Sequence, residues 1–196
     1  MEETIINEKL LLERARSGDL GSFSALVQAY QQRAIHTVYT IVGNYEDARD
    51  IAQESFVKAY KQFQSFREES RFYTWLYRIL VNTSKDFLRK KKWGQAVSFW
   101  IGSQDEGDGE TDPVARVEST ARTAPEVLMD RELGARIFEA LEKLPFRQRS
   151  VFSLRYLEGL SIEEIAESLA VSAGAVKANL WQAGEKMRKC LKGEKP

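Results

Sequence analysis

The sequence has few of the residues that build disulfides, metal sites or catalytic centres. Its 196 residues include one cysteine, Cys190, and one histidine, His36. A lone cysteine cannot form a disulfide within the chain, and one Cys with one His cannot complete a Cys/His zinc site. Nucleophile-elbow, HExxH and phosphate-loop motifs are missing as well. We therefore predict that the protein is not an enzyme and uses no metal, cofactor or small-molecule substrate.

Strong net charge and long apolar runs are also missing. Basic and acidic side chains number 29 each, so the formal net charge is zero. This balance excludes histone-like binding through bulk positive charge, although it leaves room for a local basic patch. No apolar run approaches the ~20 residues that span a bilayer, and the acidic start does not resemble a signal peptide. We expect a soluble, cytoplasmic protein.

Prolines are scarce, and the first of the four is Pro113. The alternating apolar runs typical of strands are missing, whereas apolar residues recur at spacings of three and four. The sequence therefore predicts an all-α fold. In an N-terminal domain over residues 1–93 we expect four helices, with Asp19 and Asn44 as the N-caps of the second and third. The fourth should run from about 72 to 92.

Residues 94–125 differ in composition from the rest of the chain. They carry two basic and six acidic side chains, and 102–110 contains no apolar residue except glycine. Such a segment cannot bury a core of its own. We predict a flexible acidic linker that joins two small helical domains.

Residues 126–196 form the second predicted domain and contain the sharpest local pattern. A short helix begins with the capping box Ser161–Glu164, and after a tight turn a longer helix is capped by Ser172. This order is typical of a helix-turn-helix, here at about 162–181, although a plain helical hairpin would look similar. The residues that we expect to contact DNA are Ser172, Gly174, Ala175, Lys177, Ala178, Trp181 and Gln182.

Aromatic and basic residues crowd together between 66 and 93. The rings are Phe66, Phe72, Tyr73, Trp75 and Tyr77, and the basic residues include Arg78, Lys85 and Arg89. Rings that stack on bases beside cations that hold phosphates suit single-stranded nucleic acid. Rings at helical spacing are more often core residues than nucleic-acid contacts, so the rings alone favour a structural role. The basic residues are less easily explained by a role in packing than the rings are.

A third candidate surface lies on the helix after Asn44. Asp50, Gln53, Glu54 and Val57 share one helical face, opposite much of the apolar stripe of Ile51. A mixed acidic and apolar face suits docking on a partner helix, although by composition alone a solvated charged face is the more common reading.

Four sequence blocks, in order, resemble the extracytoplasmic-function (ECF) sigma factors of bacterial RNA polymerase. The resemblance covers nearly the whole chain except the linker. The blocks are Gly18–Asp19 with 23–30, the segment 47–60, Phe66–Arg67 with 72–79 and Asn82, and the C-terminal set Leu144–Pro145, Arg149, Leu160–Ser161, 164–166 and 174–177. The second and third blocks are most similar to the envelope-stress type.

The resemblance implies a promoter-specificity factor with roles for each face. The segment with Asp50, Gln53, Glu54, Val57 and Lys58 would dock on the β′ subunit of core polymerase. The segment from 66 to 89 would read the minus-ten element, with one base flipped into a pocket near Asn82. The helix from Ser172 would read the minus-thirty-five element. Further partners would be the β subunit, promoter DNA and an anti-sigma factor.

The recognition helix departs from the family pattern. Where relatives commonly carry Arg, this chain has Asn179, Gln182 and Gly184, and Ala175 replaces a common Thr. Fewer cations predict fewer phosphate contacts and a shallower salt dependence of DNA binding. Two other readings stay open: a stand-alone helix-turn-helix regulator that binds duplex DNA unaided, and an enzyme or helical adaptor that uses the Asp50 face.

Overall fold

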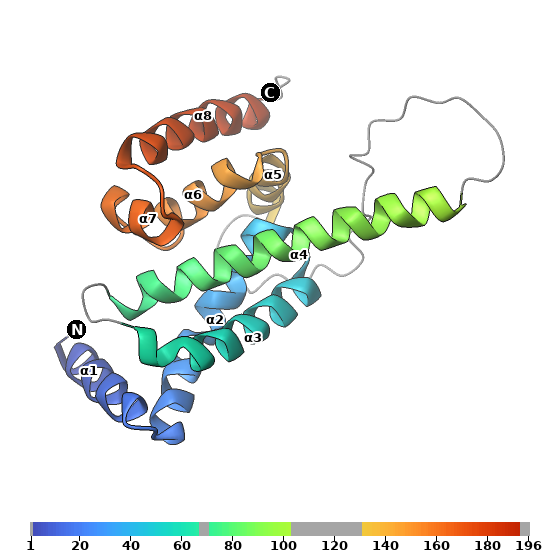
Figure 1. Ribbon diagram of the computed structural model, residues 1–196. Helices are drawn as coiled ribbons and strands as arrows, with labels where there is room; N and C mark the ends of the chain where they lie inside the picture. The colour runs from blue at the N-terminus through green and yellow to red at the C-terminus, as the bar shows by residue number, and fades with distance from the viewer. Residues whose placement is uncertain (1, 67–70, 103–130, 193–196) are drawn as a thin grey trace.

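A computed structural model of the chain describes residues 2–66, 71–102 and 131–192 (Figure 1). Within these ranges every regular element is helical, which confirms the predicted all-α class. The elements are α1 (Glu2–Arg16), α2 (Leu20–Val42), α3 (Tyr45–Gln62), a 3-10 turn η1 (Phe63–Ser65), α4 (Phe72–Gly102), α5 (Arg131–Glu142), α6 (Phe146–Tyr156), α7 (Ile162–Leu169) and α8 (Ala173–Leu191).

The first four helices form an N-terminal unit in which α2, α3 and α4 pack side by side. Asp19 caps α2 by accepting from the backbone N–H of Gly21, and Asn44 caps α3 by accepting from that of Asp47, as predicted. The inward faces of the three helices and the turn η1 then bury a common core, which includes Leu26, Val38, Ile41, Ile51, Ala59, Phe63, Phe72 and Leu80.

Helix α4 is longer than the sequence predicts. We expected it to end near residue 92, whereas the helical backbone continues to Gly102 and projects beyond the rest of the molecule (Figure 1). Gly94 does not break it, because glycine inside a helix costs only about 1 kcal/mol. The rest of the predicted linker, and the start of the predicted helix at 125, fall outside the described residues.

The last four helices form a C-terminal unit. The capping box of α7 is present as predicted: the Ser161 hydroxyl accepts from the Glu164 N–H at 3.1 Å, and the Glu164 carboxylate accepts from the Ser161 N–H at 2.8 Å. Ser172 caps α8. Helix α8 packs across α5 and α6 through Ala183 and Met187, while Val176 joins the larger core.

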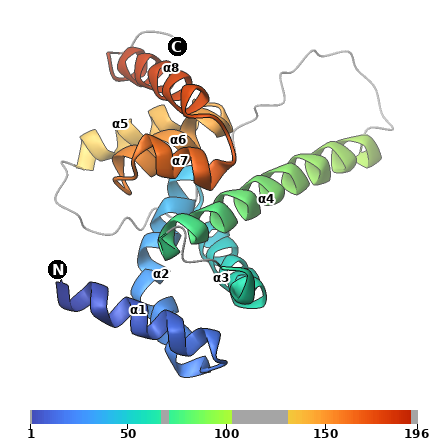
Figure 2. The same cartoon turned by 60° about the vertical axis from the view of Figure 1, so that its left-hand side comes forward.

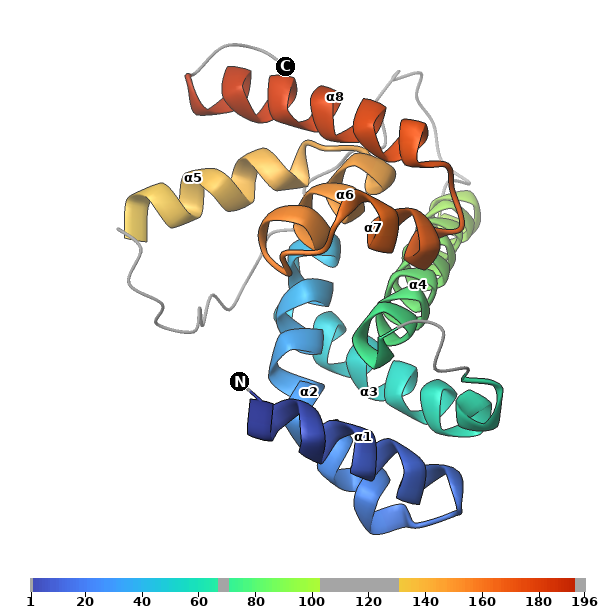
Figure 3. The ribbon, with the colours of Figure 1, turned by 90° about the vertical axis from the view of Figure 1, so that its left-hand side faces the viewer.

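The two units dock directly against each other. Figures 2 and 3 show α6 and α7 lying against α2 and the first half of α4. Core residues of α6 and α7, including Leu154 and Ile165, belong to the same buried cluster as the core of the N-terminal unit. At the end of α2, Gly43 has φ +81°, and a Cβ there would lie 3.0 Å from the Glu142 carboxylate of α5. Gly43 therefore allows the left-handed backbone that ends α2 and leaves room for the Glu142 side chain of α5.

Candidate nucleic-acid and polymerase-binding surfaces

The acidic face of α3 is exposed, as its helical spacing predicts. Asp50, Gln53, Glu54 and Val57 all face solvent, while Ile51 on the opposite side is buried. Tyr60, one turn beyond Val57, is another exposed large apolar residue. Our sequence reasoning missed it, although its spacing of three from Val57 is a usable signal. The face therefore combines carboxylates with an apolar end.

Lys58 connects this face to α4. Its ammonium lies 2.7 Å from the Glu54 carboxylate one turn earlier and donates to the Thr83 hydroxyl at 3.3 Å. The half-buried lysine is thereby held in one orientation beside Glu54. Its position suits a role in shaping the acidic face more than a role as a freely reaching cation.

Three rings of the predicted minus-ten segment belong to the core. Phe66, Phe72 and Tyr77 are each at most 3% exposed. Phe66 and Phe72 contact each other edge to face, with ring centroids 5.8 Å apart, and both pack on Phe63. In this conformation these rings cannot stack on a base. The sequence favoured the interpretation that the rings are core residues, and this interpretation holds for these three.

Trp75 differs from these three rings because it is half-buried. It packs on Phe66 with centroids 5.3 Å apart and on Phe72 at 5.8 Å. One part of the indole is therefore fixed by the core, while another part remains at the surface. A ring fixed in this way is a suitable platform for a base.

Exposed polar residues form a stripe along α4 that continues from Trp75. Arg78, Asn82, Lys85 and Arg89 follow one another at spacings of four, three and four, and all are exposed. Arg89 pairs with Asp86 at 3.2 Å, a solvent-exposed pair of small energetic weight. This stripe, hereafter the cationic stripe, lies on a different side of α4 from Tyr73 and Tyr77.

The loop before α4 is braced by α1. The Arg16 guanidinium donates to the carbonyl of Phe66 at 2.7 Å, and the Gln64 amide donates to the carbonyl of Arg16 at 3.0 Å. Residues 67–70 lie outside the described ranges. The brace was not predictable from spacing, because it joins residues about fifty positions apart.

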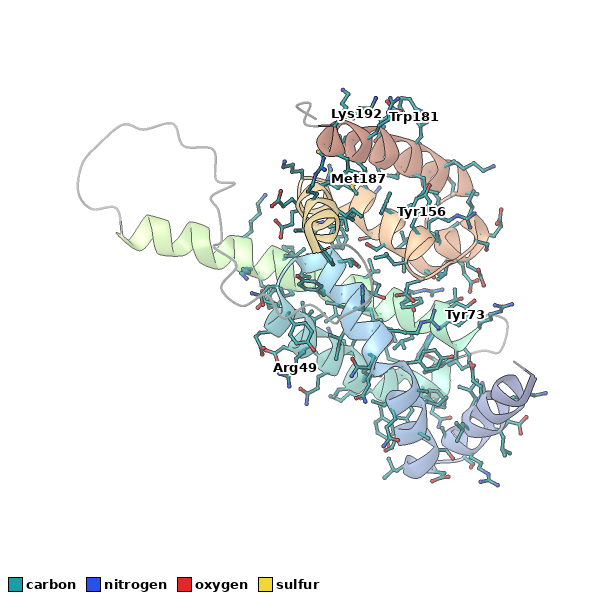
Figure 4. The ribbon with its side chains drawn as sticks, turned by 180° about the vertical axis from the view of Figure 1, so that it is seen from behind. Arg49, Tyr73, Tyr156, Trp181, Met187 and Lys192 are labelled. Atoms are coloured by element: carbon teal, nitrogen blue, oxygen red, sulfur yellow. The ribbon has the colours of Figure 1, made fainter. Side chains whose placement is uncertain are left out.

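The helix-turn-helix presents the predicted face of α8. Lys177, Ala178 and Gln182 are exposed, and Trp181, at 70% exposure, is the most exposed large apolar residue among those described. Figure 4 shows Trp181 on the outer side of α8. Ser172 and Gly174 are exposed at its start, and Ala175 is half-buried. The amide of Gln148 on α6 donates to Gln182 at 2.7 Å and orients it.

Family models match both units. A model of sigma-70 region 2 matches residues 26–94, and a model of sigma-70 region 4 matches residues 135–187. The ECF RNA polymerase sigma-E factor of Salmonella typhimurium is 35% identical over 186 residues, which cover 92% of each chain. The chain belongs to the family of ECF RNA polymerase sigma factors. In this sigma factor, region 2 therefore corresponds to α2–α4 and region 4 to α5–α8.

Other relatives and solved structures share this architecture. The RNA polymerase sigma-H factor of Pseudomonas aeruginosa is 34% identical over 94% of this chain and 93% of its own, and SigW of Bacillus subtilis is 31% identical over 94% and 96%. CnrH, solved with the cytosolic domain of CnrY, has a TM-score of 0.68 at 23% identity and covers 95% of this chain and 98% of its own. The sigma factor RpoE of Bartonella quintana, solved with the anti-sigma factor NepR, has a TM-score of 0.67 at 21% identity over 88% and 98%.

Two tyrosines that we predicted to contact DNA face region 4 instead. The Tyr73 hydroxyl donates to the Glu164 carboxylate at 3.0 Å, and the Tyr77 hydroxyl donates to that of Glu158. Figure 4 places Tyr73 on the side of α4 next to region 4. In this conformation of the sigma factor both side chains are committed to contacts within the chain.

These contacts change the protonation of the groups involved. Burial and then the Glu158 carboxylate raise the pKa of Tyr77 far above its ordinary value, so the phenol remains a donor at neutral pH. The backbone N–H of Ser161 holds the pKa of Glu164 below its usual range despite partial burial, and Tyr73 and Arg71 add to this effect. Both groups are therefore in the protonation states that the contacts between the units require.

In the described parts of the sigma factor, no cluster of His, Cys, Asp and Glu is arranged to hold a metal ion. Among the same residues, no helix is both long and apolar enough for a membrane span. Cys190 is free and half-buried, and it packs against the buried cluster that contains Leu141 and Met187.

Proposed function

We propose that this chain is a sigma factor that binds core RNA polymerase in the cytoplasm, recognises minus-ten and minus-thirty-five elements and promotes transcription initiation. It is not itself an enzyme in this proposal. The observation that carries it is the presence of regions 2 and 4 in one chain, each with an exposed face of suitable chemistry. Those faces are the acidic face of α3, the cationic stripe of α4 and the outer face of α8.

The acidic face is the proposed contact with the β′ subunit. Its exposed carboxylates, Asp50 and Glu54, complement a basic partner, and Val57 and Tyr60 add apolar area at one end. We expect the double substitution Asp50→Lys and Glu54→Lys to abolish binding to core polymerase while leaving the helical content unchanged. Pull-down with core enzyme and far-UV circular dichroism measure the two quantities.

A control for this substitution lies on another helix. Glu13 is exposed near the end of α1, outside the acidic face of α3. Glu13→Lys changes the net charge by half as much and should preserve polymerase binding. Retained binding in the double variant would contradict the proposed contact.

The cationic stripe and Trp75 are the proposed minus-ten surface. Arg78, Lys85 and Arg89 would hold the phosphates, and Asn82, which lies between them on α4, would read a flipped base. The exposed face of Trp75 would supply stacking. Phe66 and Phe72 would act indirectly in this proposal, since they hold the indole in place.

The start of α8 is the proposed minus-thirty-five reader. Backbone N–H groups at a helix N-terminus favour a phosphate, and Lys177 and Gln182 are donors suited to phosphates or base edges. Trp181 would cover apolar atoms of the major groove, such as thymine methyl groups. Region 4 has few cations on this face, so base contacts should contribute more than phosphate contacts.

We further propose that an anti-sigma factor holds the protein inactive in unstressed cells. The family resemblance motivates this, and the Bartonella quintana relative of the same fold was solved with the anti-sigma factor NepR. Affinity purification of the tagged chain from unstressed and stressed cells tests the idea. A partner should co-purify from unstressed cells, and recovery of the chain alone or with polymerase in both conditions would contradict it.

The deciding experiment for the main proposal is transcription in vitro with sigma-free core polymerase and genomic DNA. Start sites that appear only when the protein is added would support a sigma factor and reveal both promoter elements upstream. The alternative, a stand-alone helix-turn-helix regulator, predicts no initiation and a shift of duplex DNA by the protein alone.

A further inference from the structure

A pair of side-chain amides joins the first turn of α6 to the recognition helix α8. The Gln148 amide nitrogen donates to the Gln182 carbonyl oxygen at 2.7 Å. Gln148 is 8% exposed, whereas Gln182 lies at the surface, among the residues proposed to read the minus-thirty-five element. A buried amide of one helix therefore holds an exposed amide of another, and both residues belong to region 4.

The backbone is fixed at both ends of this pair. Gln148 lies just after the start of α6, where the N–H of Arg149 donates to the carbonyl of Pro145 at 3.0 Å. Ala183, next to Gln182, is fully buried in the cluster that α8 shares with α5. The orientation of the Gln182 amide is then the one feature left to set, and the hydrogen bond from Gln148 sets it.

The other end of the Gln148 amide indicates why Gln148 is the donor. Its carbonyl oxygen is buried and has no hydrogen-bond partner among the described residues. If the amide were turned over, an NH2 group with two donors would occupy this place and find no acceptor. Buried carbonyl oxygens lack a partner somewhat more often than buried N–H groups do, so the donor orientation is the more favourable one.

The hydrogen bond decides which atoms Gln182 can offer to a base. An unconstrained glutamine offers an acceptor and a donor, which match the N6 donor and the N7 acceptor of adenine. Here Gln148 occupies the oxygen, so the amide nitrogen with its two N–H groups is left for DNA. Two donors match the N7 and O6 acceptors of guanine, whereas at the N4 group of cytosine they meet another donor.

We propose that Gln148 is a positioning residue, which makes Gln182 a reader of guanine in the minus-thirty-five element. Adenine and thymine each offer one acceptor, and cytosine should be disfavoured most. Guanine accepts one more hydrogen bond than adenine, so we expect a preference of roughly three- to tenfold for guanine. The base preference rests on the proposed function, whereas the orientation of the pair in the free chain does not.

Nuclear magnetic resonance of the free, isotope-labelled chain tests the orientation of the pair. Gln148→Met and Gln182→Ala each remove one set of side-chain amide signals and thereby assign them. The Gln182 protons should exchange with solvent as fast as those of Gln28, an exposed glutamine of α2. The Gln148 protons should exchange roughly five- to tenfold more slowly. Slow exchange at Gln182 would make it the donor and would overturn the proposal.

The base preference is measured on the complete initiation complex. Transcription in vitro from a promoter with a randomised minus-thirty-five element, followed by sequencing of barcoded transcripts, gives a base ratio at each position. Gln182→Ala should level the ratio at one position, which identifies the base that Gln182 reads. Gln148→Met, which has a side chain of similar length and no donor, should lower the ratio of guanine to adenine there by roughly three- to tenfold.

Two comparisons distinguish positioning from a general structural role. The other positions of the element are internal controls, and their base ratios should not change in Gln148→Met. In a chain that already carries Gln182→Ala, the substitution Gln148→Met should change no base ratio. Far-UV circular dichroism checks the fold of each variant. If Gln148→Met lowers the helical content, the base preference and the exchange rates of the wild-type chain decide.

Three results would overturn the proposal. The first is a folded, active Gln148→Met chain that keeps the wild-type ratio of guanine to adenine. The second is a wild-type preference for adenine or cytosine at the identified position, and the third is a Gln182→Ala chain that leaves every position unchanged. A wild-type chain that makes no transcripts would instead contradict the proposed function, and the exchange rates in the free chain would then test the amide pair.

Discussion

Two glycines of region 4 allow the effect of backbone conformation on stability to be measured without a steric clash. Gly159 has φ +72°, whereas Gly184 lies within α8, and a Cβ at either position would meet no atom within 4 Å. Gly184→Ala should raise the free energy of unfolding by about 1 kcal/mol, because alanine is the better helix former. Gly159→Ala should lower it by about 1–2 kcal/mol, because a left-handed backbone strains a residue with a Cβ.

Urea denaturation followed by far-UV circular dichroism measures both values, and the wild-type chain supplies the reference. Each glycine serves as the other's control, since both substitutions add one methyl group at a site with free space. A destabilising Gly184→Ala would contradict the helix-propensity argument. It would indicate a role for Gly184 that the described contacts do not show.

Helical periodicity was enough to place the exposed candidate residues. Asp50, Gln53, Glu54 and Lys177 face solvent because their neighbours at spacings of three and four face the core. Glu158 could not be found in this way. It is one of 29 acidic residues and has no distinctive spacing, and its partners Thr37 and Tyr77 lie 121 and 81 positions away. Pairing over such distances leaves no periodic signal.

At the scale of elements, the start of α7 should make stability depend on pH. The hydrogen bond from the Ser161 N–H is the largest cause that holds the pKa of Glu164 below its ordinary value of 4.5. Hydrogen bonds from the Tyr73 and Ser161 side chains and the charge of Arg71 act in the same direction. A depressed folded-state pKa contributes stability that is present above the unfolded-state pKa and is lost as the pH falls through the folded-state pKa. The free energy of unfolding should therefore fall between about pH 6 and about pH 3, and Glu164→Gln should reduce that fall.

The pH dependence has more than one source, and a control separates them. Asp19 also has a pKa below its ordinary value, chiefly because the Ser22 hydroxyl donates to it, so part of the fall should persist in Glu164→Gln. Glu163→Gln removes an exposed carboxylate from the same turn without touching the capping box. Urea denaturation at a series of pH values compares the three chains. Identical profiles for Glu164→Gln and the wild type would refute the prediction.

The start of α8 should show which contacts with DNA depend on charge. Lys177→Ala should reduce the salt slope of minus-thirty-five binding by about one if Lys177 contacts a phosphate, because one fewer counterion is released. Trp181→Ala should weaken binding without changing the slope. Lys189→Ala, at the far end of the helix, should change neither. Titration of the polymerase complex with labelled promoter DNA at several salt concentrations measures the slopes, and an unchanged slope in Lys177→Ala would place that lysine on a base or off the DNA.

Element boundaries were predictable where capping residues mark them and less so elsewhere. Asp19, Asn44, Ser161 and Ser172 each cap a helix at the expected position. The end of α4 carries no such mark, and the helix continues to Gly102. For the aromatic residues between 66 and 77, the sequence indicated that most rings belong to the core, but it could not tell which ring is buried and which is exposed. The same helical spacing suits a core ring and a ring that stacks on a base.

At the scale of the whole molecule, the docking of the two units could not be predicted from sequence patterns. Periodicity tells which face of a helix is buried and says nothing about what covers it. Thr40 and Tyr77 are polar residues buried by region 4, and each is satisfied by a partner from that unit. We predicted two small helical domains joined by a linker, and the structure adds that the two units share one apolar core.

Docking leads to the last prediction, which concerns DNA binding by the free chain. We expect the free protein to bind a promoter duplex far more weakly than its complex with core polymerase, because the docked chain can use at most one of its two reading faces. The zero net charge adds little attraction for phosphates. On polymerase, the two faces are held apart and act together, so each raises the effective concentration of the other.

Fluorescence anisotropy of one labelled promoter, with the free chain and then with the complex, compares the affinities at matched salt. Duplexes in which either element is scrambled serve as controls, and each scrambled duplex should bind the complex much more weakly. The free chain should respond to the minus-thirty-five element alone, because the proposed minus-ten surface reads unpaired bases and a closed duplex keeps them paired. Equal affinities with and without polymerase, and a response to both elements in the free chain, would mean that region 4 is not held on α2 and α4 in solution. The two reading faces would then act as independent modules, and the polymerase would contribute catalysis without arranging them.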